Sequence, residues 1–291
     1  MTYTYTEIPG WKTRLSIGGT CVEFVSCDIK EKKQIVEDDG LRGSRTRQLE
    51  RVAMGQTHIG GSITMQPTPA DIALILPFVF NSASPAVTLT DIMQDVTVVM
   101  DTFTELSTYV GRFSKMTLSG SPGKKIDLKL DFVGKSATFA GGGSLSTAPD
   151  VTNRPYMFSD AGATAMTINS VAYSIDKFEL VVDNKITPTY MSGLLPTDLE
   201  PSDRVCTLGI QTRYTTEQTL LTLAQAGPVI ASPLAGSLGF TNGTNSISFL
   251  WAAMLAQSET VAIQGRQNLR LPLNYNLYGV STTKEMITTL V

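Results

Sequence analysis

The sequence predicts a mainly β protein made of two tandem β-sandwich or barrel modules, each with one short flanking helix. Glycine (24 residues) and proline (14 residues) are frequent and only 17% of the residues are charged, a composition typical of turn-rich β proteins. Apolar and polar residues alternate in several segments, as in strands with one buried face. Both halves of the chain also carry the same order of elements, namely strand, Arg-Val pair (Arg51-Val52 and Arg204-Val205), strand, helix and long strand. This repeat predicts a duplicated module.

The first half begins with strand candidates at Val22–Ile29 and Ile59–Met65. A short helix with the sequence ADIALIL is expected next. Thr68 fits its N-cap, Pro69 its first position and Asp71 its third, where a carboxylate faces N–H groups that have no partner within the helix. A long strand closes the half, with apolar residues on one face and polar residues on the other: Ile126, Leu128, Leu130 and Phe132 against Asp127, Lys129 and Asp131.

The second half repeats this order. Its first strand candidates are Ser174–Asp183 and Cys206–Tyr214. A helix is expected between Thr215, which has capping-box spacing to Gln218, and Gly227, a residue suited to end a helix. The closing strand alternates in the same way: Leu269, Leu271, Leu273 and Tyr275 against Asn268, Arg270 and Asn274.

The boundary between the modules is expected in the segment Ala137–Asp150, which reads ATFAGGGSLSTAPD. Three consecutive glycines and an almost complete lack of charge are typical of a linker or loop. The sequence therefore predicts a first module over residues 1–140 and a second over residues 141–291.

The segment Asp28–Arg51 has an unusual density of charge, with 13 charged residues among 24. One interpretation is a solvated surface loop. The other is a loop, Gln34–Arg51, that becomes ordered against a neighbouring subunit, where its mixed charges pair and set the register. The residues that would make these contacts are Glu37, Asp38, Asp39, Leu41, Arg42, Arg45, Arg47 and Leu49.

Residues that could form an active site are scarce. His58 is the single histidine, and no Gly-x-Ser-x-Gly sequence provides it with a nucleophile. The three cysteines, Cys21, Cys27 and Cys206, have neither the number of a disulfide framework nor the spacing of a zinc site. We therefore expect no enzymatic activity, no cofactor and no bound metal, with all three thiols reduced.

The net charge of −3 excludes a strongly basic nucleic-acid-binding protein. The N-terminal sequence MTYTYTEIPGW lacks the basic and apolar regions of a secretory signal. The longest apolar run, Ile72–Phe80, is interrupted by Pro77 and is far shorter than the ~20 residues that span a membrane. We expect a protein made without export and without a membrane anchor.

Three long segments resemble the tail tube proteins of long, flexible-tailed bacteriophages. They are Val22–Phe80, Lys115–Phe139 and Asp176–Thr215, and together they cover roughly two thirds of the chain. The order of the strings FELVVDN, PTDLEPSDR and TLGIQTRYT, with the matching plan in the first half, carries the resemblance. It implies a β-sandwich or barrel unit with a flanking helix. Six such units form a ring whose inner sheets join into one continuous barrel of 24 strands.

The resemblance implies a structural subunit of the virion that is assembled in the cytoplasm of the host bacterium. Rings stack into a hollow tube around a tape-measure protein, with terminator and tail-tip proteins at the ends, and double-stranded DNA later passes through. Because this chain carries two units, we expect a ring of three chains with pseudo-sixfold symmetry. The alternative is a soluble β-sandwich module that binds a carbohydrate or a receptor.

In such a tube the polar faces of the alternating strands would line the lumen. The expected lumen residues are Asp127, Lys129, Asp131, Glu179, Asp183 and Arg270. Four acids and two bases give this set a net charge of −2 per chain. We therefore expect the tube to conduct DNA without binding it tightly.

Overall fold

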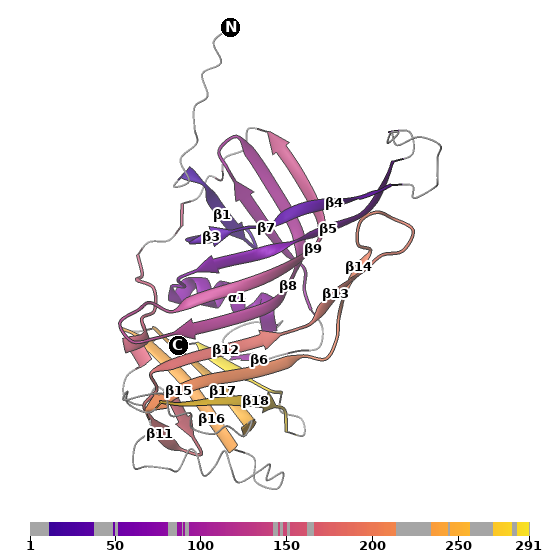
Figure 1. Ribbon diagram of the computed structural model, residues 1–291. Helices are drawn as coiled ribbons and strands as arrows, with labels where there is room; N and C mark the ends of the chain where they lie inside the picture. Colours follow the sequence, from indigo (N-terminus) through magenta and orange to yellow (C-terminus); the bar gives the residue numbers. More distant parts are fainter. Residues whose placement is uncertain are drawn as a thin grey trace.

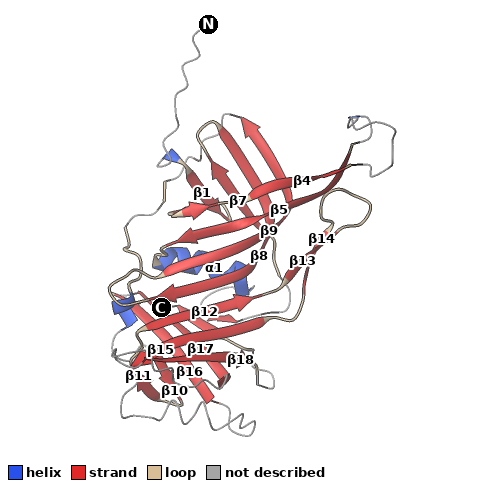
Figure 2. Cartoon of the chain, in the orientation of Figure 1, coloured by secondary structure: helices blue, strands red, loops and turns tan. Residues whose placement is uncertain are grey.

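The computed structural model describes residues 12–37, 49, 52–80, 86–88, 90, 93–141, 145, 148–149, 152–161, 166–213, 234–243, 245–256, 270–280 and 284–290. In these residues the chain is mainly β and contains one α-helix (Figure 2), so the predicted mainly β class is confirmed. The second helix, predicted between Thr215 and Gly227, lies outside the described residues.

One antiparallel sheet, which we call the inner sheet, runs through both halves of the chain (Figure 1). In order of pairing, its strands are β4 (Lys30–Val36), β5 (Ala53–Met65), β9 (Asp127–Gly141), β8 (Glu105–Gly120), β12 (Lys177–Asp183), β15 (Val205–Arg213), β18 (Arg270–Tyr278) and the C-terminal part of β17 (Asn245–Ala256). The short β3 (Ser26–Cys27) precedes β4 and also pairs with β5. The halves meet at β8 and β12, where Lys115 pairs with Asp183 and Gly120 with Phe178.

A second layer covers one face of the inner sheet. In the first half it contains β1 (Arg14–Ile17), β2 (Thr20–Val22), β6 (Ala86–Thr88) and β7 (Val96–Asp101). In the second half it contains β10 (Met166–Ile168), β11 (Val171–Tyr173), β16 (Leu234–Asn242), β17 (Asn245–Ala256) and β19 (Ile287–Leu290). β19 pairs with both β17 and β6 and so connects the two halves a second time. A separate hairpin, β13 (Ile186–Thr189) and β14 (Asp198–Pro201), follows β12.

The same order of antiparallel pairings occurs in both halves. In the first half the order is β2–β1–β7–β8–β9–β5–β4. In the second half it is β11–β10–β16–β17–β18–β15–β12. The duplication of a module and its boundary within residues 137–150 stay predictions.

Apolar side chains between the two layers form one core cluster that includes residues of both halves. The helix α1 (Pro69–Phe80) packs on this core, with Ile75 and Leu76 almost fully buried. Its expected cap is confirmed: the Asp71 N–H donates to Thr68 Oγ1 (3.2 Å), and the Thr68 N–H donates to Asp71 Oδ2 (2.9 Å).

Three predicted boundaries were wrong. Val22–Ile29 is not one strand, because β2 ends at Val22 and β3 covers only Ser26–Cys27. Residues 137–141 belong to β9 instead of a linker, because they pair with the first residues of β8, from Tyr109 opposite Ala137 to Glu105 opposite Gly141. Residues 34–36 belong to β4 instead of the predicted loop Gln34–Arg51. A register shift between Lys33 and Ile35 interrupts their regular pairing with β5.

Candidate functional site

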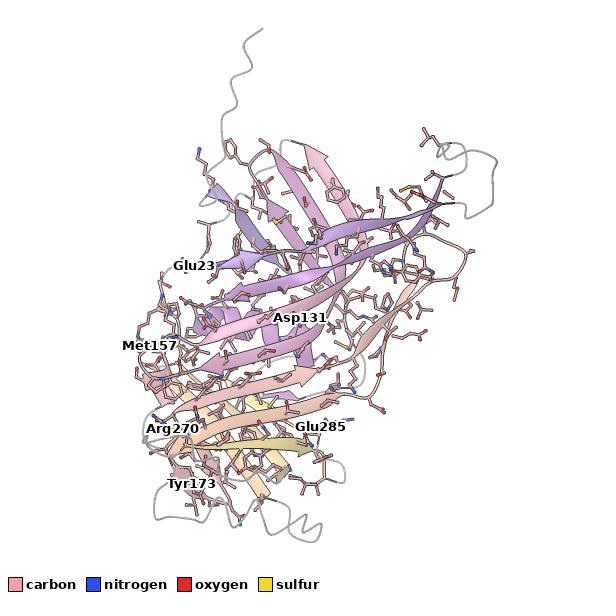
Figure 3. All side chains as sticks on the ribbon, viewed as in Figure 1. Glu23, Asp131, Met157, Tyr173, Arg270 and Glu285 are labelled. Carbon is pink, nitrogen blue, oxygen red and sulfur yellow. The ribbon has the colours of Figure 1, made fainter. Side chains whose placement is uncertain are left out.

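The uncovered face of the inner sheet is a broad polar surface. Along β9, β12 and β18, buried apolar residues alternate with exposed or half-buried polar ones. All six lumen candidates, Asp127, Lys129, Asp131, Glu179, Asp183 and Arg270, lie at the positions that point away from the core. Figure 3 shows Asp131 on β9 and Arg270 on β18. We call this surface the polar face.

The strand registers place charged residues of opposite sign beside each other on the polar face. Lys115 of β8 lies between Asp131 of β9 and Asp183 of β12 in one cross-strand row. The Lys129 Nζ atom is 3.3 Å from Asp131 Oδ1. Two of the basic residues therefore have a carboxylate as a direct neighbour, which partly neutralises them towards solvent anions.

The registers also show charged residues that the sequence-based set missed. Lys30 and Lys32 lie opposite Gly60 and His58 of β5, on the polar face. Further residues of this face are Asp28, Lys115 and Lys177. Together with the six lumen candidates, these five residues make a set of five acidic and six basic side chains. The net charge of −2 expected for the six candidates stays a prediction, and the larger set is close to balanced.

One acid on the polar face is held in its ionised form. The Ser62 backbone N–H donates to the Asp28 carboxylate, and this hydrogen bond lowers the pKa of Asp28 below its usual value. The Asp28 N–H in turn donates to the Ser62 carbonyl (3.0 Å). The row that starts with Asp28 and Ser62 continues through Asp131, because Ser62 pairs with Asp131.

A shallow hollow of about 480 Å³ lies on the polar face over β12, β15 and β18. Its floor includes Gly209, which has no side chain, and its walls include Glu179, Gln211, Asn274 and Asn276. The lining of the hollow is mixed, with apolar residues such as Val181 and Pro272, the charged residues Lys177 and Glu179, and the neutral polar residues.

Two arms extend from the edge of the inner sheet. The first, which we call the ribbon, consists of the outer parts of β4 and β5 (residues 33–37 and 52–56). Of the predicted subunit-contact residues, Glu37 directly follows β4 and Leu49 is 82% exposed. The others lie outside the described residues: Asp38, Asp39, Leu41, Arg42, Arg45 and Arg47.

The second arm is the β13–β14 hairpin, which sequence reasoning missed. It leaves β12 of the second half but lies against the first half (Figure 1). The Tyr190 hydroxyl donates to the Thr57 carbonyl (3.0 Å) and is 2.8 Å from His58 Nδ1. Because the hydroxyl has one proton, His58 donates through Nδ1. The single histidine thus has a structural role in this contact.

Arg112 of β8 fixes the base of the β13–β14 hairpin. Its Nε donates to Asp95 Oδ1 (2.7 Å), and one of its Nη atoms donates to the Leu199 carbonyl. The other Nη is 3.9 Å from Asp198. Leu199 and Ile186 also pack with Met93 in a small apolar cluster, separate from the main core.

Residues 4–277 match the sequence model of a family described as phage tail tube protein. The chain belongs to this family. The resemblance found in the sequence is thereby confirmed over nearly the whole chain. No curated protein matches the sequence.

Members of this family are structural components of the phage virion, and the family implies self-assembly into a tube together with other tail proteins. The polar face and the two arms are therefore candidate surfaces for the lumen and for contacts between subunits. Among the described residues, no helix is long and apolar enough to cross a membrane.

Proposed function

We propose that three copies of this chain close into a ring, that the rings stack, and that the polar faces line a conduit for double-stranded DNA. The single observation that carries the proposal is the inner sheet, which passes without interruption from one half to the other through β8 and β12. In the described part of the chain β4 pairs only with β5, so the sheet ends in an open edge. Ring closure is the usual way to remove such an edge.

Two independent features support the equivalence of the halves. The β1–β2 and β10–β11 hairpins both turn on two residues of positive φ, Gly18-Gly19 and Asn169-Ser170, which lie 151 positions apart. The closing strands match at Phe132 and Tyr275, 143 positions apart. The pairing registers agree with both of these offsets. In the first half, Asp28 and Asp131 both lie opposite Ser62 of β5. In the second half, the residues at the same two offsets, Glu179 and Asn274, both lie opposite Gly209 of β15.

The registers also give the geometry of the proposed barrel. The cross-strand row that starts at Asp28 and Ser62 passes through Asp131 and Lys115 and ends at Asp183 of β12. The residue of β12 that corresponds to Asp28 by the offset of 151 positions is Glu179. The register therefore shifts by four residues across each four-strand unit. A rise of about 3.3 Å per residue and a strand spacing of about 4.8 Å then give a strand tilt of about 35°. Six units give a backbone diameter of about 45 Å, and inward side chains reduce the open bore to about 35 Å.

The balanced charge of the polar face favours passage of DNA without tight binding. Lys115 and Lys129 lie beside Asp131, so a phosphate would have to compete with a carboxylate for each of them. Few counterions are then released when a duplex enters, and little affinity results. The same bore would hold the tape-measure protein before DNA passes, and terminator and tail-tip proteins would close the tube ends. This role is structural and needs no catalytic group.

Native mass spectrometry of isolated rings tests the proposal. A mass of three chains is expected, and electron micrographs should show rings or tubes with a central channel. Six full-length chains per ring would overturn the argument from the repeated pairings. A compact monomer under all assembly conditions would favour the alternative, a soluble binding module.

A further inference from the structure

Exposed apolar side chains gather on the two arms. Of the fifteen large apolar side chains that the described part of the chain exposes, seven lie there: Ile35, Val36, Val52, Met54, Met191, Leu194 and Leu195. An eighth, Leu49, adjoins the ribbon, because the Val52 N–H donates to its carbonyl (3.1 Å). Single exposed apolar residues are normal on a protein surface, but a concentrated group marks an interaction site. Ile35 and Met54 are cross-strand partners in the ribbon, so their side chains are neighbours.

The β13–β14 hairpin is joined to the ribbon through the main chain. β5 pairs with β9 only as far as Ile59 opposite Gly134, and beyond this point β9 turns away. The Thr57 N–H then donates to the Leu194 carbonyl (2.7 Å). The hairpin thus lies beside β5 at the position that β9 leaves, and Leu194 is bonded to β5 three residues from Met54 of the ribbon.

Side chains hold the hairpin at two further points. Arg112, whose side chain is 16% exposed, links Asp95 of the first half to the Leu199 carbonyl of β14. Hydrogen bonds from a charged donor are stronger than neutral ones, and this one is shielded from solvent. Near the tip, Tyr190 contacts Thr57 and His58 of β5.

We propose that the β13–β14 hairpin is a strap that fixes the direction of the ribbon, with Arg112 and Tyr190 as positioning residues. The strap and the ribbon together present a preformed apolar surface, which we call the tip surface, to a second copy of this chain in the next ring. This inference rests on the proposed function. The tip surface includes the eight exposed apolar residues named above.

The geometry indicates a copy in the next ring as the occupant. Both arms extend beyond the inner sheet roughly along the direction of its strands (Figure 1). In the proposed barrel the strands lie about 35° from the tube axis, so the arms point mainly along the axis. Neighbours within a ring would instead meet at the open edge of β4. The tip surface is therefore directed at a stacked copy.

Two sets of variants test the strap. The double variant Arg112→Ala/Tyr190→Phe removes its side-chain contacts, and Met191→Ser/Leu194→Ser makes the tip surface polar without touching the core. Arg154→Ala is the matched control, because the half-exposed Arg154 side chain pairs with Asp160 and with no residue of either arm that the structure describes. Ring mass, tube length in micrographs and hydrogen exchange of the Thr57 amide are measured for each.

We expect all variants to form rings of normal mass. The strap variant should increase the exchange rate of the Thr57 amide at least tenfold. Both the strap variant and the tip variant should raise the protein concentration needed for tube formation about tenfold. Arg154→Ala should behave like the original chain. Normal tubes from the tip variant would overturn the inference, as would unchanged Thr57 exchange in a strap variant. Failure of the unaltered chain to form rings would instead contradict the proposed function.

Discussion

Replacing Asn184 by leucine should strongly destabilise the join between the two halves. Asn184 is 2% exposed and lies in the turn between β12 and β13. Its Nδ2 donates to the carbonyls of Val79 (3.2 Å) and Phe113 (3.4 Å), and its Oδ1 accepts from Arg204 Nε (3.0 Å). Arg204 also reaches the Thr90 carbonyl and Glu285, so one buried network connects α1, β8, β12 and the C-terminal segment.

Asn184→Leu leaves two carbonyls and one guanidinium N–H without these partners. Each buried polar group that loses its hydrogen bond costs about 1–3 kcal/mol, and the Phe113 contact is long, so the expected total is about 3 kcal/mol. For a chain of this size that loss lowers the melting temperature by about 5–10 °C. A double-mutant cycle of Asn184→Ala and Arg204→Ala should show a coupling free energy of about 1–2 kcal/mol.

Urea denaturation of the dissociated subunit, followed by near-UV circular dichroism, measures these changes. Asn153→Ala is the control, because the side chain of Asn153 is exposed and its Nδ2 donates only a long hydrogen bond to Thr152 Oγ1 (3.4 Å) among the described residues. It should change the free energy of unfolding by less than about 0.5 kcal/mol. A loss below 1 kcal/mol for Asn184→Leu, or additive effects in the cycle, would refute the reasoning that this network holds the halves together.

Three further predictions concern assembly, thiols and pH. Replacing residues 38–51 by a short Gly-Ser link should leave a folded subunit that forms no tubes in electron micrographs; normal tubes would reject an assembly role for this loop. Burial raises the pKa of Cys206 to about 12, so its thiol should resist an aromatic disulfide reagent at pH 8 until the chain unfolds, as timed labelling and mass spectrometry can show. The lowered pKa of Asp28 contributes stability above the usual aspartate pKa of about 3.9, and this contribution is lost as pH falls through the folded value. In acid titrations Asp28→Asn should therefore show a smaller loss of stability than the original chain, and an identical pH profile would contradict this assignment.

The sequence allowed the strands and their faces to be predicted wherever the pattern is local. Alternation placed Asp127, Lys129 and Asp131 on one face of β9, and the register agrees. The capping residue Thr68 was equally clear, because its hydrogen bonds reach only three residues along the chain. The same alternation could have identified Lys115 and Lys177 on the polar face.

Contacts between distant segments could not be predicted. The pairing of β8 with β12 joins residues about sixty positions apart, and nothing local in either strand specifies the partner. The docking of Tyr190 on His58 is likewise set by the fold, since the two residues are 132 positions apart. The extension of β9 to Gly141 was hidden because glycine-rich composition favours a loop, whereas pairing with β8 determines the outcome.

A reconstruction of the assembled tube by electron cryo-microscopy tests the central claim most directly. The account predicts three chains per ring and one continuous inner barrel, with strands tilted by about 35° and a backbone diameter of about 45 Å. At each boundary between chains, the register should repeat that of β8 and β12, in which Lys115 lies opposite Asp183. Six full-length chains per ring, or a gap in the barrel between chains, would contradict the account.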